Sequence, residues 1–325
     1  GFNTAICYYS PASSTITTQY TTNFNTTVLQ DVSADGLRQL LTYGGRLYEL
    51  NSTTTTELTT DTSLSIPAEY ACYNPDRKRI AIIMPGGTGN YPLKPQIFLY
   101  TISTQKLTKI TDTDTVKKYI SWRSTSPELL YTDEVSPGVH RLHTVKVNGS
   151  SKTRFISTNT DNEPTTEEIG ARWCSDGIKA VYCRKVLGDN GGIFVTDGTG
   201  PGGNITLNTY LTSEIAGYNV VDDITYFSGQ DADYYVSGLY SITGHDNAVR
   251  ITSFGYNDRF ASFNTDSSEI AIQSRFLDVS GSSYGIYTAS VSTPWDRTLL
   301  RASSAFPDWG TNDKIMYTKI GRAHV

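Results

Sequence analysis

The sequence predicts an all-β protein built as a β-propeller of four-stranded blades, on three observations. Short runs of β-branched and aromatic residues alternate with clusters of Gly, Pro, Asn and Asp along the 325 residues, as strands alternate with turns. The same order of signals returns at intervals of about 41 to 50 residues, which is the repeat length of propeller blades. No window carries apolar residues at helical spacing over three turns.

The clearest repeat lies between Tyr73 and Thr111. A polar turn at 74–77 leads into the β-branched run at 80–83, and a Gly/Pro-rich loop separates this run from a second one at 97–100. A further turn precedes a third short run at 107–110. These signals predict a small antiparallel meander. Because such a meander cannot bury a face alone, neighbouring copies must stack, and closure of the stack protects the edges.

A turn residue marks each copy of the repeat. The markers are Asp35, Asp76, Ser126, Asp176, Asp223, Asp266 and Asp313. They predict repeats at 29–65, 66–113, 119–158, 168–210, 216–254 and 260–303, with a partial repeat at 305–319. We therefore expect one propeller domain over residues 1–319 with seven blades, six or eight being the alternatives, and a truncated last blade. Residues 1–28 are expected to supply strands of the first or closing blade.

The last six residues, 320–325, resemble the translation of a sequencing-adapter read. They are set aside from the prediction as an artefact, as a cloning scar is. The natural protein is expected to continue beyond residue 319.

Three segments carry a family resemblance: ARWCSDGIKAVYC at 171–183, ASFNTDSSEIAIQS at 261–274 and PDWGTNDKIMYTK at 307–319. They resemble the W-S-P-D-G-x-x-I-A-F repeat of the TolB-type, WD-repeat-like β-propeller family. The copies are degenerate, since residues 74–77 lack the Gly and residues 122–125 lack the Asp. In that family the motif marks a turn and a hairpin, so the resemblance implies the fold and transfers no catalytic residue.

Composition excludes two classes of partner. The net charge is −5, and no basic cluster is longer than Arg77–Arg79, so nucleic acid is not an expected partner. No apolar run approaches the length that crosses a bilayer, so no membrane span is expected.

Composition, sequons and the habit of the family that the chain resembles indicate a secreted protein, with the periplasm as the alternative location. The candidate N-glycosylation sites are Asn25, Asn51, Asn148 and Asn204. The candidate disulfide cysteines are Cys7, Cys72, Cys174 and Cys183, which permit three pairings, and buried thiols are the alternative. If Cys174 and Cys183 flank a tight hairpin, a bond between them would be strained, because bonded Cα atoms must lie within about 7 Å.

Three motifs that resemble functional loops are interpreted as turns. Residues 281–285 match G-x-S-x-G, but a strand and not a helix is predicted to follow them. Residues 198–203 match G-x-G-x-x-G without a helix that could hold phosphate. Residues 31–36 begin like a calcium loop, but the twelfth position is Thr42 in place of Glu.

Polar and aromatic residues give no clear site. His140 and His143 are three apart on a predicted strand, so they point to opposite faces and share no metal ion. Six acidic residues are interpreted as solvated loops, with cation or partner contact as the alternative: Asp112, Asp114, Asp161, Glu163, Glu167 and Glu168. Five tyrosines either form a binding surface or pack between blades: Tyr8, Tyr9, Tyr234, Tyr235 and Tyr284.

Without a catalytic, metal or cofactor site, the sequence favours a non-catalytic binding or scaffold propeller. It would recognise a protein or glycan partner through loops at one end of the channel, with contacts at the long connections 85–95, 188–192 and 228–233. The resemblance leaves open the propeller domain of a larger enzyme, either a prolyl-oligopeptidase-type serine peptidase or a carbohydrate lyase. A glycosylated, self-assembling subunit of a surface or filament assembly is the third alternative.

Overall fold

In the computed structural model, the described residues cover the strands and most of their turns. They are 2–22, 28–32, 38–43, 46–51, 54–58, 70–86, 94–148, 152–154, 166–173, 177–186, 189–197, 204–208, 211–219, 224–230, 237–243, 249–252, 255–264, 266, 268–276, 283–309 and 314–322.

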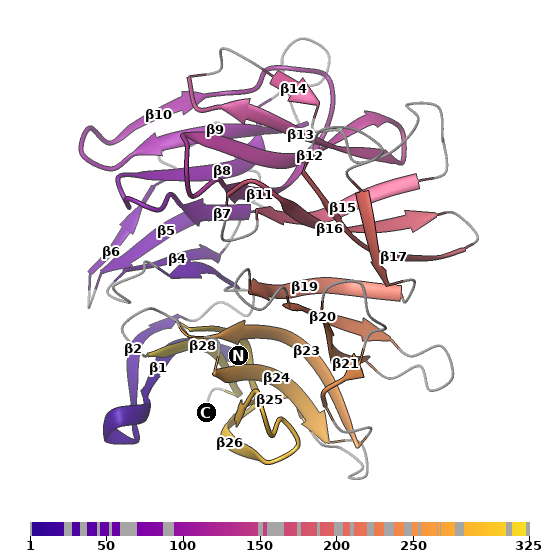
Figure 1. Ribbon diagram of the computed structural model, residues 1–325. Coiled ribbons are helices and arrows are strands. Elements are labelled where there is room, and N and C mark those ends of the chain that lie inside the picture. Colours follow the sequence, from indigo (N-terminus) through magenta and orange to yellow (C-terminus); the bar gives the residue numbers. More distant parts are fainter. Residues whose placement is uncertain are drawn as a thin grey trace. The chain divides into compact units, whose positions relative to one another are not determined.

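These residues form seven four-stranded sheets, in which every pairing that is described is antiparallel (Figure 1). Apart from a short 3-10 helix at Pro11–Ser13, all regular elements in the described ranges are strands. The all-β prediction is therefore confirmed. No helix in this part of the chain has the length and apolar character that crossing a membrane requires.

The chain divides into two compact units, one of residues 68–233 and 241–249 and the other of residues 1–67, 234–240 and 250–325. Three sheets lie within the first of these. Their strand orders are β10 (Lys106–Lys109), β9 (Pro95–Thr101), β8 (Arg79–Pro85), β7 (Tyr70–Tyr73); β11 (Lys117–Trp122), β12 (Glu128–Ser136), β13 (Val139–Lys146), β14 (Lys152–Arg154); and β15 (Thr166–Trp173), β16 (Ala180–Val186), β17 (Asp189–Thr196), β18 (Asn204–Asn208).

Three sheets lie within the other unit. Their orders are β3 (Val28–Val32), β4 (Arg38–Tyr43), β5 (Arg46–Asn51), β6 (Thr54–Glu57); β23 (Tyr256–Phe263), β24 (Glu269–Phe276), β25 (Gly285–Ser290), β26 (Arg297–Ala302); and β2 (Thr15–Thr22), β1 (Phe2–Ser10), β28 (Ile315–Arg322), β27 (Ser304–Trp309). The seventh sheet has the order β19 (Leu211–Asn219), β20 (Ile224–Gln230), β21 (Ser237–Thr243), β22 (Val249–Arg250).

The sheet of β1, β2, β27 and β28 joins both ends of the chain. Phe2 lies opposite Arg322 and Tyr9 lies opposite Ile315 in the β1–β28 ladder. Residues from the amino-terminal segment thus supply two of the four strands of this sheet, as expected for a closing blade. Residues 320–322, which were set aside as an artefact, continue β28 and pair with residues 2–4.

Central strands are buried on both faces, which explains why β8 and β9 read as continuous apolar runs rather than alternating ones. The sheet of β11–β14 shows how this works, since successive residues of a strand face opposite sides. Leu129, Tyr131 and Val145 pack against Ala81, Ile83 and Ile97 of the preceding sheet. Leu130 and Leu142 pack against Ala171, Ala180 and Tyr182 of the following sheet.

Two predicted turns are strands in the structure. Residues 189–192 of the expected connection 188–192 belong to β17, and Asp189 pairs with Val186 across a tight hairpin. The Thr-rich tract 51–56 predicts a turn on the rim, but its last three residues belong to the edge strand β6, Thr54–Glu57. Neither segment has an apolar pattern that predicts a strand, because the first is rich in Gly and the second is a polar edge strand that faces solvent.

Candidate functional site

The first wall of the candidate site is the turn between β7 and β8. The backbone N–H of Asn74 donates to the carbonyl oxygen of Arg79 at 3.0 Å, and its side-chain Oδ1 accepts from the N–H of Arg79 at 2.8 Å. The carboxylate of Asp76 accepts from the N–H of Lys78 at 3.0 Å and from the Asn74 amide. Arg77 takes a left-handed backbone conformation with φ 57°. Asn and Asp suit this turn because their short side chains bond the neighbouring backbone.

The same turn recurs between β23 and β24. Asn264 donates its N–H to the carbonyl of Glu269 at 3.1 Å, and its Oδ1 accepts from the N–H of Glu269 at 2.9 Å. The carboxylate of Asp266 accepts from the N–H of Ser268 at 3.0 Å. The two marker aspartates that lie in the described residues, Asp76 and Asp266, therefore hold turns, as predicted.

The second wall is the turn between β11 and β12, at residues 122–127, where the side chain of Arg123 is fixed on three sides. Its Nε donates to the carbonyl of Gly177 at 2.6 Å, its Nη1 lies 2.6 Å from a carboxylate oxygen of Glu128, and its Cζ lies 4.7 Å from the centre of the Trp173 ring. Trp122 is also held, since its indole N–H donates to the carbonyl of Cys72 at 3.3 Å.

The two turns enclose a pocket of about 310 Å³. Asp76, Arg79 and Arg123 bring charges to its lining, and Pro75, Trp122 and Pro127 bring apolar surface. The backbone N–H of Lys78, the Asn74 amide and the nearby cations of Lys78 and Arg79 hold the pKa of Asp76 below its usual range, so this carboxylate is ionised at neutral pH. We refer to this cavity as the turn pocket.

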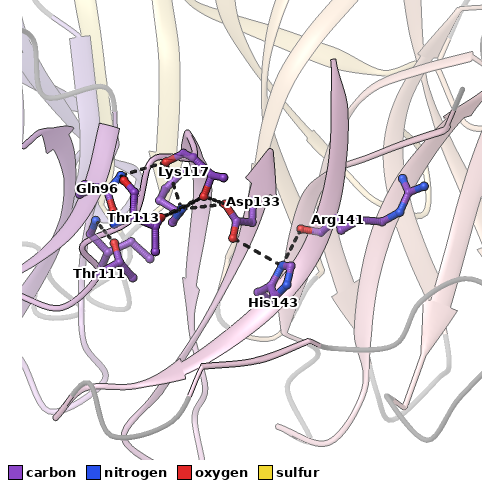
Figure 2. Close-up of polar contacts among 9 residues, drawn as sticks. Gln96, Thr111, Thr113, Lys117, Asp133, Arg141 and His143 are labelled. Carbon is purple, nitrogen blue, oxygen red and sulfur yellow. Dashed lines mark hydrogen bonds and ion pairs between the residues drawn. The ribbon is translucent and has the colours of Figure 1, made fainter. Parts of the chain in front are cut away.

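A buried polar network lies at the other end of β11 and β12 (Figure 2). Lys117 is fully buried, and its Nζ lies 2.7 Å from Oδ1 of Asp133, which is 1% exposed. The ammonium group also donates to Oγ1 of Thr113 at 2.6 Å and to the carbonyl of Thr115 at 3.1 Å. A buried charge is tolerated only when it is paired and hydrogen-bonded in this way.

The same network fixes the connection from β10 to β11. The Gln96 side chain donates to the carbonyls of Thr113 and Thr115 at 3.0 and 2.9 Å and accepts from the N–H of Thr113 at 3.1 Å. Thr111 Oγ1 accepts from the N–H of Ile97 at 2.9 Å. Residues 111–115 are therefore bonded to β9, β11 and β12, and the network is closed to solvent at Gln96 and Lys117.

His140 and His143 lie on β13 and bind different partners. His143 Nδ1 lies 3.4 Å from the carbonyl of Arg141 and 4.0 Å from Asp133, and its ring stacks on Tyr131 with centroids 5.8 Å apart. His140 Nδ1 lies 3.1 Å from Glu167. Each imidazole lies near a different carboxylate, as expected for side chains three apart on a strand, which point to opposite faces.

Polar pairs occupy the same ladder position in other sheets. Lys117 pairs with Asp133, Glu168 with Arg184, Asp258 with Ser274 and Ser304 with Lys319. Asp258 is 1% exposed, accepting from Ser274 Oγ at 2.6 Å and from Arg297 at 2.8 Å. Four of the described sheets thus carry a buried polar side chain at this position of the first strand.

Sequence reasoning misplaced Glu167 and Glu168 and did not identify Lys117. Glu167 and Glu168 lie on β15 and not on an acidic loop, and Glu168 is fully buried with a carboxylate oxygen accepting from the N–H of Leu142 at 2.9 Å. A signal was present, because Lys117 and Glu168 each stand five residues before the Trp that ends their strand. Asp112 and Asp114 are exposed as expected, whereas Asp161 and Glu163 lie outside the described residues.

The candidate disulfide cysteines lie on different sheets. Cys7 on β1 and Cys183 on β16 are buried, Cys72 on β7 is half-buried, and Cys174 lies outside the described residues. Cys7 Sγ lies 3.7 Å from Oγ1 of Thr18, and Cys72 Sγ lies 4.0 Å from the carbonyl of Ile120. Burial raises the pKa of Cys7. Disulfide pairing stays a prediction.

The candidate glycosylation sites and loop motifs are only partly described. Asn51 and Asn148 are exposed, Asn204 begins β18, and Asn25 lies outside the described residues. Gly285 of the 281–285 motif begins β25, which pairs antiparallel with β24, so a hairpin stands where a hydrolase would need a helix. Residues 198–203 and 33–36 lie outside the described ranges, and Asp31 and Thr42 lie on β3 and β4.

The five tyrosines that could form a binding surface are also only partly described. Tyr9 packs against the core cluster that contains Cys7 and Tyr317. Tyr284 lies beneath two guanidinium groups, 5.0 Å from Arg259 and 5.2 Å from Arg275. The side chain of Tyr8 and residues 234 and 235 lie outside the described part of the chain.

Comparison with known proteins shows the fold. No protein-family model matches the chain, and no curated protein does. Among solved structures, it is similar to a TolB from Agrobacterium tumefaciens, with TM-score 0.55 and 13% identity over 98% of this chain and 99% of that one. It is also similar to an oligogalacturonate lyase from Vibrio parahaemolyticus, with TM-score 0.67 and 10% identity over 99% and 98%. Prolyl endopeptidases match with TM-score 0.63 and 10% identity, over 96% of this chain and 46% of theirs.

A TolB-like β-propeller fold is thus supported, at an identity too low to carry function. Another similar structure is an oligogalacturonate lyase in complex with manganese. Within the described residues, no three His, Cys, Asp or Glu side chains are grouped so that they could hold a metal ion. These residues therefore do not fit such an ion.

Proposed function

We propose that this chain is a non-catalytic binding or scaffold propeller that recognises a partner through the turns at one end of its sheets. Seven four-stranded sheets in the described residues support a propeller of seven blades. Three of the sheets present a turn closed by the same backbone hydrogen bond, from Asn74, Arg123 and Asn264 to the residue five positions later, so variation in the turn residues can change recognition without changing the fold.

The turn pocket is the observation that carries this proposal. It combines apolar surface from Trp122 and two prolines with a few charged groups held in place by hydrogen bonds, as ligand sites generally do. The Arg123 side chain is positioned before any ligand arrives, which lowers the entropic cost of binding.

Filling the pocket tests the proposal. Ser124 is exposed and lines the pocket, whereas Ser136 is exposed at the far end of β12. We expect Ser124→Trp to abolish capture of the partner from native extract, and Ser136→Trp, the matched control, to leave capture unchanged. Equal capture by both variants would show that the partner does not bind at the turn pocket.

A second candidate is the propeller of an enzyme. The chain covers the lyase neighbour almost end to end, but it spans 46% of the prolyl endopeptidases. The lyase alternative is tested by incubating the chain with oligogalacturonate and following the unsaturated product. Under the binding proposal no product forms, and turnover that a pocket-filling variant removes would replace that proposal.

We also propose an extracellular or periplasmic location. Exposed Asn51 and Asn148 support it, because a glycan attached at either would extend into solvent. Peptide mass spectrometry of the chain secreted from eukaryotic cells is the test, and sugar on these asparagines is the expected result.

A further inference from the structure

We propose that the turn pocket binds a carboxylate of a partner protein and that Arg79 is the residue that anchors it. This inference rests on the proposed function and specifies the chemistry of its ligand. It is carried by Arg79, which lines the pocket, and by the charges around it.

Arg79 differs from Arg123 in what its side chain does. Arg123 uses its guanidinium to bond Gly177 and Glu128 and to cover Trp173. The hydrogen bonds of Arg79 in the described residues belong to its backbone, through its N–H and carbonyl to Asn74, and none involves its guanidinium. Arg79 is half-buried and lines the pocket, and its guanidinium keeps its hydrogen-bond donors for a ligand, while its charge acts on the Asp76 carboxylate without a hydrogen bond between them.

A carboxylate is the ligand that matches this group. The two parallel N–H donors of a guanidinium bind the two oxygens of a carboxylate in one plane, and such charged hydrogen bonds are about twice as strong as neutral ones. Asp76 limits the charge that the ligand can carry, because its ionised carboxylate lies in the same lining. A dianion such as phosphate would be repelled by Asp76 more strongly than a monoanion.

The size and apolar surface of the pocket favour a peptide. At about 310 Å³ it stands at the small end of ligand pockets, which span roughly 300 to 1,000 Å³. This volume suits one acidic residue with its neighbours rather than several sugar rings. Pro75 and Pro127 offer surface to the methylene groups of such a residue. The carboxylate is either an Asp or Glu side chain or the carboxyl terminus of the partner.

Arginine-detected NMR of the folded chain tests the inference directly. The probes are three tripeptides: one with a central Glu and both ends blocked, one of Ala with a blocked amino terminus and a free carboxyl terminus, and one with both ends blocked and Gln in place of Glu. We expect saturable shifts of the Arg79 Nε signal with the first two, with dissociation constants on the order of 1 mM, and no shift with the third. The stronger of the two binders identifies the source of the carboxylate.

Two variants with the same change in charge provide the control. Arg79→Gln keeps the turn, which depends on backbone groups of residue 79, and is expected to weaken binding at least about tenfold, the loss expected when a charged hydrogen bond is removed. Arg259→Gln removes an exposed arginine that is absent from the pocket lining and is expected to leave affinity unchanged. A folded Arg79→Gln variant with full affinity would overturn the inference.

Phosphate and galacturonate complete the test. Stronger binding of phosphate than of the Glu peptide would overturn the argument from Asp76, and stronger binding of galacturonate would assign the pocket to glycans. Failure of the inference remains distinct from failure of the proposed function. If Ser124→Trp abolishes partner capture and Arg79→Gln does not, the pocket recognises its partner without a carboxylate.

Discussion

At the residue scale, Lys117 is the clearest case of a buried charge that is tolerated only because all its neighbours pair with it. Its ammonium group is removed from water together with Asp133, and it is bonded to both Thr113 and Thr115. Removing two charges from water costs several kcal/mol each, and their mutual attraction offsets this cost only when the remaining donors are also satisfied. The pair therefore makes the register of β11 on β12 specific more than it makes the protein stable.

We expect Lys117→Met to destabilise the protein by about 3–5 kcal/mol, because it leaves the Asp133 carboxylate buried without a counter-charge. The double variant Lys117→Met with Asp133→Leu should recover most of that loss. Denaturant unfolding measures both, with the half-buried neighbour Lys118→Met as control. A single variant that unfolds like the control would contradict the pairing.

Alkaline pH provides a second test at this scale. Burial raises the pKa values of the Tyr131 and Tyr317 hydroxyls well above the usual value. Since the unfolded state loses these protons first, their contribution to stability is complete below the unfolded pKa of about 10 and is lost as pH rises beyond it. Ultraviolet titration should show both tyrosines ionising only with unfolding, and Tyr131→Phe and Tyr317→Phe should leave the ionisation that precedes unfolding unchanged. Ionisation of either tyrosine in the folded protein would count against this account.

Single residues were the least predictable part of the sequence. The Asn-Pro-Asp turn was recognisable because its chemistry is local. Lys117 and Asp133 are sixteen positions apart, and nothing short-range indicates that they meet. The turn pocket was missed for the same reason, since it forms between turns of two adjacent sheets, and recognition had been expected at the long connections.

At the element scale, a serine hydroxyl repeatedly joins one sheet to the next. Ser121 Oγ accepts from the N–H of Trp173 at 3.1 Å, and Ser262 Oγ accepts from the N–H of Trp309 at 2.9 Å. Each serine stands immediately before the aromatic residue that ends the first strand of its own sheet. This hydrogen bond fixes how far one sheet is shifted relative to the sheet that packs against it.

We expect Ser121→Ala to lower stability by about 1 kcal/mol, the usual net value of one hydrogen bond. Ser262→Ala should lower it somewhat more, because the Ser262 hydroxyl also donates to Asp308 at 3.2 Å. The serines lie in separate sheets and share no partner, so the effects should add in the double variant. Thermal unfolding measures the loss, with exposed Ser136→Ala as the neutral control. A loss no larger than the control's would mean that water replaces the hydroxyl.

Strands were predicted best where both faces are buried. The runs at 80–83 and 97–100 lie within β8 and β9, as predicted. Short, continuous apolar runs bounded by turn residues indicate buried strands. The edge strand β6, with the sequence Thr-Thr-Thr-Glu, has no apolar pattern. Its strand conformation depends on pairing with β5, which the local sequence does not encode.

At the scale of the whole molecule, the sheet that contains β1 and β28 depends on residues from both ends of the chain (Figure 1). Cys7 from β1 is buried in one cluster with Trp309, Ile315 and Tyr317. Removing β1 would expose that cluster and the full length of β28. Such an open edge is also a template for aggregation.

We expect deletion of residues 1–22 to remove the cooperative unfolding transition, because two strands of a sheet exceed what a net stability of about 5–15 kcal/mol can lose. Deletion of residues 323–325, beyond the last residue of β28, is the control and should leave the transition in place. Calorimetry with size-exclusion chromatography distinguishes unfolding from aggregation. A truncated chain that keeps the cooperative unfolding transition would show that β1 contributes little to the stability of the protein.

The β1–β28 ladder also sets an order of events during biosynthesis. Thr4 pairs with Ile320, so a ribosome working at about 5–20 residues per second delivers the second partner some 15–60 s after the first. Until β28 has been synthesised, the backbone amides of β1 that pair with it have no partner, and the apolar residues of β1 are exposed to the surrounding cell. Holding chaperones should therefore bind the β1 segment of the nascent chain, and slowed translation should lower the yield of native protein more than it would for a fold in which each strand pairs with one made shortly after it.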